Sequence, residues 1–155
     1  MRFFSSLLTA LPAALVAQAV VIARQSGVGS GGPIIAPTAG STLAAGQEFP
    51  FEYGNTNICH SGYSQVHVYL TETVPAATDV NNGELADPLY DFGLFTIANF
   101  GLPPFDNQVP AALTAPELSG APEDIFLAVV ETFLGCPPDG HSAWGLSSTP
   151  VEYQA

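Results

Sequence analysis

From residue 33 onward, apolar and polar residues alternate along the chain with a period of two. The clearest example is the segment 65–71, in which Val66, Val68 and Leu70 alternate with more polar neighbours. Successive side chains of a β-strand point to opposite faces of a sheet, so this pattern predicts a strand with one buried face. Gly and Pro interrupt the pattern about every eight to twelve residues, which is typical of an all-β sandwich.

About seven segments have this strand pattern. Residues 125–133 are the most apolar, with both faces hydrophobic as far as Glu131, which predicts a central strand that is covered on both sides. Pro50 has no amide hydrogen to donate, so the segment 49–53 is predicted to be an edge strand or to contain a bulge. The predicted strands are 34–35, 49–53, 65–71, 92–98, 109–113, 125–133 and 144–153.

The first residues of the chain have the composition of a secretion signal. A positive charge at Arg2 precedes an apolar stretch at 3–17, and Ala-Gln-Ala at 17–19 is a small-x-small cleavage site. The apolar stretch is too short to span a bilayer, so we expect a secreted protein with no membrane attachment after cleavage. The predicted parts are a signal peptide at 1–19, a flexible Gly/Ser leader at 20–32 and one β-sandwich domain at 33–155.

The charged residues are strongly one-sided. The chain has 14 Asp and Glu residues and only two basic residues, Arg2 and Arg24, of which Arg2 belongs to the predicted signal. Nucleic acids and anionic membranes bind clustered Lys and Arg side chains. We therefore expect the protein to bind neither of them.

Cys59 and Cys136 are the only cysteines in the sequence. Two thiols in an oxidising compartment form one disulfide, which here would close a long loop. Both residues follow predicted strands, so the bond requires the two loops to lie at the same end of the sandwich. In the chain-entropy model such a bond stabilises the fold by about 4.5 kcal/mol, so a structural role alone accounts for it.

The predicted disulfide places two histidines at one end of the fold. His60 is next to Cys59, and His141 follows Cys136 closely, with Asp139 between them. Two imidazole nitrogens and one carboxylate are a ligand set for copper or zinc. The alternative is that both histidines are solvated loop residues beside a structural bond.

Several aromatic residues are candidates for ligand binding. Exposed rings stack on sugars, and the candidates are Tyr69, Phe100, Phe105 and Trp144. The alternative is that these rings fill the core, as aromatic residues do in sandwich folds. The stretch from Phe100 to Phe105 is predicted to be an exposed apolar loop and a contact surface.

No motif for catalysis or for a cofactor stands out in the sequence. The chain lacks the Gly-x-Ser-x-Gly turn of serine hydrolases, a Cys-x-x-Cys pair and a phosphate-binding Gly-rich loop before a helix. Acid pairs such as Glu123–Asp124 or Asp87/Asp91 are available to a glycosidase, but nothing in the sequence holds two carboxyl groups across a cleft. We expect a protein that is not an enzyme and that has no cofactor.

Residues 34–53 carry a resemblance to a known family. They open with a hydrophobic-x-x-Pro sequence, continue through Gly-Ser and Ala-Gly turns at 40–41 and 45–46, and end in the alternating strand that closes at Tyr53. This resembles the N-terminal immunoglobulin-like domain of fungal secreted cell-wall proteins, of the type associated with yeast β-1,6-glucan assembly. The resemblance implies a single antiparallel immunoglobulin-like β-sandwich in an extracellular or wall location, and it supplies no catalytic residue.

These observations predict a small secreted, non-catalytic protein. It would associate with the extracellular matrix or a fungal cell wall by binding polysaccharide or a protein partner. The alternative is a secreted metal-dependent or hydrolytic enzyme that uses the His60/His141 end of the fold.

Overall fold

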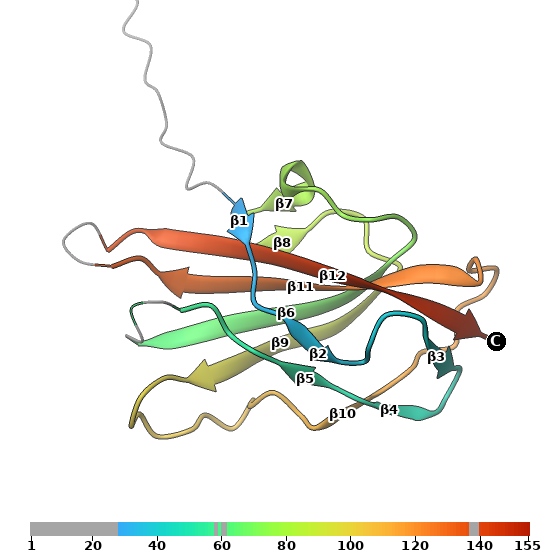
Figure 1. Cartoon of the computed structure of the whole chain (residues 1–155), viewed down its shortest axis with the longest axis horizontal. Coiled ribbons are helices and arrows are strands. Elements are labelled where there is room, and N and C mark those ends of the chain that lie inside the picture. The colour runs from blue at the N-terminus through green and yellow to red at the C-terminus, as the bar shows by residue number, and fades with distance from the viewer. Residues whose placement is uncertain (1–27, 58, 60–61, 137–139) are drawn as a thin grey trace, which may run out of the picture.

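The structure is a computed structural model of the chain, and it describes residues 28–57, 59, 62–136 and 140–155 (Figure 1). The predicted signal peptide at 1–19 and the leader as far as residue 27 lie outside the described residues. The described part is all-β apart from one short 3-10 helix, η1 (Ala77–Asp79), and none of its helices is long and apolar enough to cross a membrane. Its strands are β1 (Val28–Ser30), β2 (Ile34–Ala36), β3 (Ser41–Ala44), β4 (Glu48–Pro50), β5 (Glu52–Tyr53), β6 (Tyr63–Thr71), β7 (Val80–Asn81), β8 (Glu84–Leu85), β9 (Tyr90–Ala98), β10 (Ala112–Thr114), β11 (Asp124–Leu134) and β12 (Ser142–Gln154).

Six strands form the main sheet, and four of them are long. Its order is β1-β12-β11-β6-β9, and β3 pairs with the other part of the same edge of β12. The long strands β12, β11, β6 and β9 run antiparallel to their neighbours, whereas β1 and β3 run parallel to β12. The main sheet is therefore mixed, and not wholly antiparallel as the family resemblance implies, because β1 and β3 pair in parallel with the edge of β12. β11 lies at its centre (Figure 1), as the apolar run 125–133 predicts.

Shorter strands lie opposite the main sheet. β4 pairs with β10, and β5 pairs with β2, both antiparallel. Only Phe51 separates β4 from β5, so the predicted strand 49–53 is split directly after Pro50. The split lets the first half pair with β10 on one side and the second half pair with β2 on the other.

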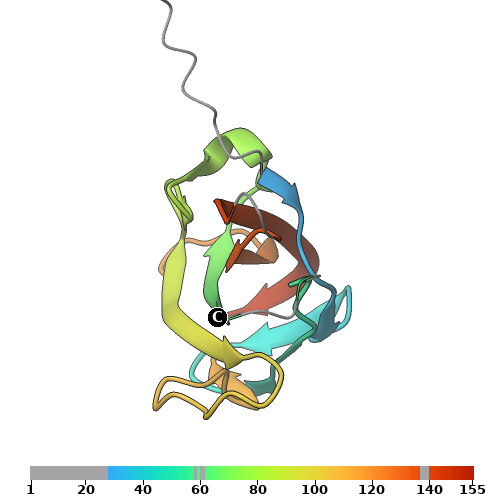
Figure 2. The ribbon, with the colours of Figure 1, turned by 90° about the vertical axis from the view of Figure 1, so that its left-hand side faces the viewer.

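The main core lies between the main sheet and these shorter strands (Figure 2). The main sheet contributes alternate residues of β6 and β11, as the period of two predicts. The facing strands, with Phe51 between β4 and β5, contribute Phe49, Phe51, Tyr53 and Leu113, and the main sheet contributes Leu43, Val66, Val68, Leu70, Ile125, Leu127 and Val129.

A second, smaller core covers the other face of the main sheet. Tyr69 of β6 and Ala128 and Val130 of β11 pack there against Leu85 of the β7–β8 hairpin. This explains why the sequence of β11 is apolar on both faces, because each face of the strand is buried.

The strand β1 differs from the sequence prediction, which places these residues in a flexible leader. Val28–Ser30 pair with Trp144–Leu146 of β12, and the amide of Gly31 donates to the carbonyl oxygen of Leu146 at 2.9 Å. The contact is so close that a Cβ atom at Gly145 would lie 2.7 Å from Cα of Gly31. The composition of these residues does not predict the strand, because the strand has no apolar pattern. It is held by backbone hydrogen bonds, and glycines at 31 and 145 allow the two backbones to approach closely.

We expect Gly145→Ala to lower the free energy of unfolding by about 1–3 kcal/mol, because the new methyl group overlaps backbone atoms that cannot rotate away. Urea denaturation measures the change. Gly29→Ala is the matched control in β1, since the nearest atom to its added Cβ is 3.9 Å away. An equal loss in both variants would show that chain flexibility, and not the close approach of β1, sets the effect.

Candidate functional site

The disulfide bond connects two loops at one end of the main sheet. Cys59 lies between β5 and β6, Cys136 lies between β11 and β12, and their Cα atoms are 5.4 Å apart. This confirms the predicted pairing. The end at which β6 and β12 begin and β9 and β11 end, on the left of Figure 1, is called the disulfide end below.

The surface of the disulfide end carries exposed apolar side chains. Phe100, Leu102 and Phe105 belong to the loop after β9, and Leu134 is the last residue of β11. Their exposed fractions are 86%, 37%, 49% and 49%. We call these four residues the apolar patch.

The loop after β9, which carries three of the four patch residues, is held in place by Tyr63, the first residue of β6. The hydroxyl of Tyr63 donates to the carbonyl oxygen of Pro103 at 3.2 Å, and its ring packs edge-on against Phe105 with centroids 4.5 Å apart. The amide of Leu102 donates to the carbonyl oxygen of Asn99 at 3.2 Å. These contacts hold the backbone of the loop and the ring of Phe105 in place.

Beneath this surface, the core contains a fully buried carboxylate. Glu131 continues the row of β11 side chains that face the main core, and its exposed fraction is 0%. Its carboxylate accepts hydrogen bonds from the Tyr53 hydroxyl at 3.0 Å, from the Thr56 amide at 2.9 and 3.1 Å and from the Thr56 hydroxyl at 2.8 Å. No Lys or Arg occurs in the described part of the chain, so neutral donors alone compensate this charge.

The Tyr53 hydroxyl keeps its proton and donates it in a hydrogen bond to this carboxylate. Burial, and then the negative charge of Glu131, raise the pKa of Tyr53 well above its ordinary value. The same oxygen accepts a hydrogen bond from the amide of Gly32 at 2.7 Å, and the carbonyl oxygen of Gly32 accepts one from Ser147 at 2.6 Å. The carboxylate is therefore linked to the segment that joins β1 to β2.

A second part of this network reaches the loop of the apolar patch. The side-chain amide of Asn55, which precedes Thr56, donates to the side-chain oxygen of Asn99 at 2.6 Å. Asn99 in turn donates to the carbonyl oxygen of Gly62 at 3.0 Å and to the hydroxyl of Ser64 at 3.3 Å. Asn99 directly precedes Phe100, so the buried network ends at the base of the exposed loop.

The predicted metal ligands are only partly described. His141 is exposed at the disulfide end, where its carbonyl oxygen accepts a hydrogen bond from the amide of Gly135 at 2.8 Å. His60 and Asp139 lie outside the described residues. Within the described ranges, no group of three His, Cys, Asp or Glu side chains is placed to hold a metal ion, and the site stays a prediction from sequence.

The predicted ligand-binding aromatics fall into two groups. Phe100 and Phe105 lie at the surface of the disulfide end, whereas Tyr69 is buried under the β7–β8 hairpin with an exposed fraction of 2%. The Tyr69 hydroxyl accepts a hydrogen bond from the amide of Leu85 at 3.4 Å, and burial raises its pKa to about 12. Trp144 is half-buried beside Gly83 of the same hairpin, and its indole nitrogen has no hydrogen-bond partner among the described residues.

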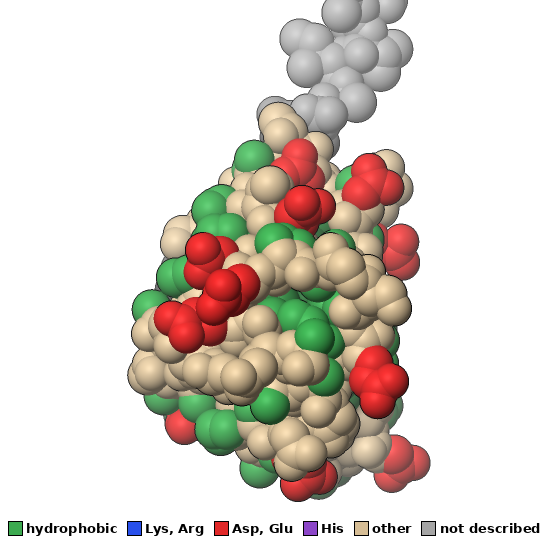
Figure 3. All heavy atoms as spheres, turned by 90° about the vertical axis from the view of Figure 1, so that its right-hand side faces the viewer, with side chains coloured by type: hydrophobic (Ala, Val, Ile, Leu, Met, Phe, Trp, Pro, Cys, Tyr) green, Lys and Arg blue, Asp and Glu red, His purple; other side chains and the backbone are tan. Residues whose placement is uncertain are grey.

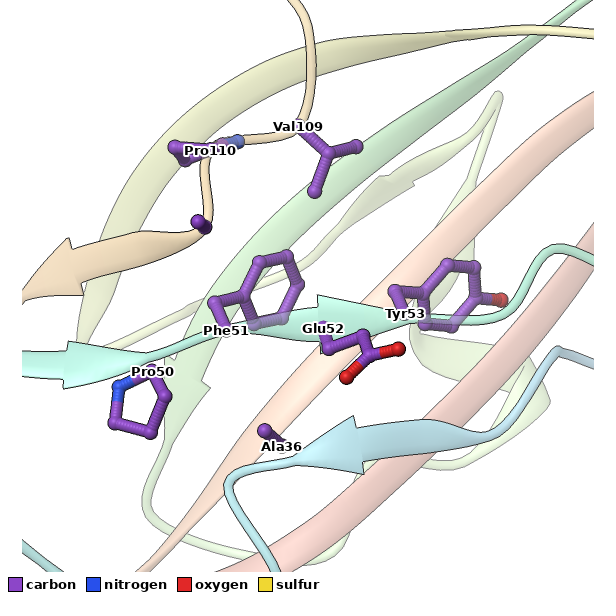
Figure 4. Close-up of a pocket in the computed structure, with 8 residues that line it drawn as sticks. Ala36, Pro50, Phe51, Glu52, Tyr53, Val109 and Pro110 are labelled. Carbon is purple, nitrogen blue, oxygen red and sulfur yellow. The ribbon is translucent and has the colours of Figure 1, made fainter.

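A groove of about 350 Å³ lies along β4 and β5, between β2 and the segment that precedes β10 (Figure 4). Glu52 supplies the only carboxylate among its lining residues. Glycoside hydrolysis needs two carboxyl groups about 5–10 Å apart, and this lining has one. The groove is lined by Ala36, Pro50, Phe51, Glu52, Tyr53, Val109, Pro110 and Ala111.

The acidic side chains gather away from the apolar patch. Figure 3 views the end opposite the disulfide, and several acidic groups lie on its surface. In the described loops of the disulfide end, Asp106 is the only exposed acid. The acids at or next to the strand termini of the opposite end are Glu72, Asp87, Asp91, Glu123, Asp124 and Glu152.

Sequence reasoning predicted the exposed loop but missed the buried network behind it. The available signal was Glu131 itself, an acid in the core-facing register of an otherwise apolar strand. Its donors had no signal, because Tyr53 and Thr56 lie 78 and 75 positions away in the chain. A comparison of the chain with protein-family models, curated proteins and solved structures gives no match.

Proposed function

We propose that the protein is a small secreted, non-catalytic binding protein of the extracellular matrix or a fungal cell wall. Its ligand is a polysaccharide or a protein partner, and its binding surface is the apolar patch of the disulfide end. The observation that carries this proposal is the 86% exposure of Phe100 on a loop that is held by a buried polar network. Stability alone favours apolar groups in the core and polar groups at the surface. The disulfide end has polar groups in its interior and apolar groups at its surface, and departures of this kind are expected at functional sites.

The proposed fold is an immunoglobulin-like sandwich. The order β12-β11-β6-β9 corresponds to strands G, F, C and C′ of a variable-type domain, and β2, β5 with β4, and β10 correspond to A, B and E. In this assignment the loops that carry Cys59 and Cys136 are the B–C and F–G loops. These are the loops through which variable domains bind their ligands.

Secretion is supported by the disulfide, since such bonds persist in oxidising compartments. The separation of charge from the patch supports an uncharged ligand surface. Neutral wall polysaccharides have such a surface, and so do the apolar sites of proteins. With the patch turned towards an uncharged surface, the acidic end remains in water.

The test is retention of the mature protein on insoluble β-glucan and on chitin. We expect wild type to be retained on at least one of them, and Phe100→Ala/Phe105→Ala to lose at least about tenfold in affinity, as aromatic anchors do. Val74→Ala is the matched control, because Val74 is an exposed apolar residue (61%) after the opposite end of β6. Equal retention of wild type and the double variant would exclude the apolar patch, and no retention on either polymer would exclude wall-polysaccharide binding.

A further inference from the structure

We propose that Glu131 is the positioning residue of the binding surface. Its buried carboxylate orders the loop that carries Cys59, and through that loop it orders the loop that carries the apolar patch. The inference rests on the proposed function for its effect on binding, but its effect on the two loops stands independently.

The first step is from Glu131 to Thr56. Both the amide and the hydroxyl of Thr56 donate to the carboxylate, at distances of 2.8 to 3.1 Å. The site requires acceptors only, because the third partner, the Tyr53 hydroxyl, also donates to it at 3.0 Å. A carboxylate offers two acceptor oxygens, whereas a Gln side chain of the same size offers one and turns a donor towards these donors.

The second step is from Thr56 to the loop of the apolar patch. Asn55 is adjacent to Thr56, and its side-chain amide donates to the side-chain oxygen of Asn99 at 2.6 Å. Asn99 has an exposed fraction of 6%, and it is bonded on three sides, by Asn55, Gly62 and Ser64. A shift of residues 55–56 therefore withdraws one of the partners that fix Asn99, which is next to Phe100.

A purely stabilising role would not require this arrangement. An ionised carboxylate without a cation partner costs more to bury than an apolar side chain of similar size. The residues that precede Glu131 in the same row, Ile125, Leu127 and Val129, are apolar. The acid occurs only where the row reaches the loops of the disulfide end. There it accepts hydrogen bonds from Thr56 of the loop that carries Cys59 and from Tyr53, the last residue of β5 before that loop.

The test is site-resolved amide hydrogen exchange on the full mature protein with its disulfide intact, comparing wild type with Glu131→Gln. We expect the amides of Thr56 and of Leu102, which bonds to Asn99, to exchange at least about tenfold faster in the variant, because local opening of both loops becomes easier. The amide of Val68 in the centre of β6 exchanges by global unfolding, so it should accelerate only by the factor that the variant's loss of global stability, measured by urea denaturation, accounts for. Thr56→Ser keeps both donors and is the conservative control, and it should leave all three rates close to wild type.

Two outcomes would overturn the proposal. Wild-type exchange rates at Thr56 and Leu102, with acceleration confined to Val68, would show that Glu131 only stabilises the whole fold. An acceleration at Thr56 with no change at Leu102 would show that its influence stops before the apolar patch.

The binding assay then separates this inference from the proposed function. If wild type binds β-glucan or chitin, we expect Glu131→Gln to weaken binding by at least about tenfold although the residue has no exposed surface. Unchanged affinity would overturn its positioning role in binding. If wild type binds neither polymer, the polysaccharide form of the proposed function fails, while the exchange rates still decide the role of Glu131 in the two loops.

Discussion

Replacing both Cys59 and Cys136 with Ala is expected to lower the free energy of unfolding by about 4.5 kcal/mol, the chain-entropy value for a loop of this length. The bond spans 77 positions of the chain, so its loss gives the unfolded chain much additional freedom. The loss is a large part of the roughly 5–15 kcal/mol that stabilises a typical domain. Guanidinium denaturation of the variant and of wild type, under the same oxidising conditions, measures the difference.

The matched control for this prediction is wild type with the disulfide reduced and the thiols blocked by a small alkylating reagent. Its stability should agree with that of the alanine variant to within about 1 kcal/mol, because both remove the same restriction on the unfolded chain. If the alanine variant remained as stable as the oxidised protein, the bond would have no stabilising role. Its position beside the apolar patch would then need a functional explanation.

Replacing Glu131 with Ala is expected to lower the free energy of unfolding by about 3–5 kcal/mol. The substitution leaves the buried Tyr53 hydroxyl and the two part-buried donors of Thr56 without their acceptor. A buried unsatisfied donor costs about 1–3 kcal/mol, and a part-buried one costs less. Part of this cost is relieved where water enters the cavity left by the side chain. Urea denaturation at neutral pH measures the loss.

Two further variants test the origin of this loss. Tyr53→Phe removes one donor and leaves the carboxylate with the two donors of Thr56, so its loss should be smaller, about 1–2 kcal/mol. Glu152→Ala removes an exposed acid of β12 and should change stability by less than about 0.5 kcal/mol. If Glu131→Ala were as mild as Glu152→Ala, the buried network would not contribute to stability.

Much of the fold follows from the sequence because side chains in a strand alternate between two faces. The alternation of Val66, Val68 and Leu70 predicted the core face of β6, and the apolar run of β11 predicted a central strand covered on both sides. Such patterns are local, and a residue's face depends only on its place in the strand. The pairing of two cysteines also needed no structure, since no other partner was available to either residue.

Pairing partners and exact strand limits were less predictable. In the segment 49–53, Pro50 indicated an edge strand or a bulge. Only the structure shows that the two halves of the segment pair with different strands, β10 and β2. No sequence pattern indicated the strand β1. Glycine and serine give no apolar signal, and the strand is defined by backbone hydrogen bonds and by the close approach of Gly31 to Gly145.

The sequence also could not predict which of the candidate aromatic residues are exposed. Tyr69 and Phe100 are both aromatic residues in or next to strands, yet one is buried under a hairpin and the other is 86% exposed. The difference depends on the β7–β8 hairpin, which packs on the outer face of the main sheet and covers Tyr69. No pattern within a few residues of either ring contains that information.

By itself, the sequence determined that the protein is all-β, that β11 is central, that Cys59 bonds with Cys136 and that the loop beginning at Phe100 is apolar. Each of these depends on residue type or on spacing along one segment. Only the tertiary structure decided that Glu131, Thr56 and Asn99 form a network behind that loop. Hydrogen bonds between buried side chains depend on distances in space, and the chain brings these residues together from three separate segments.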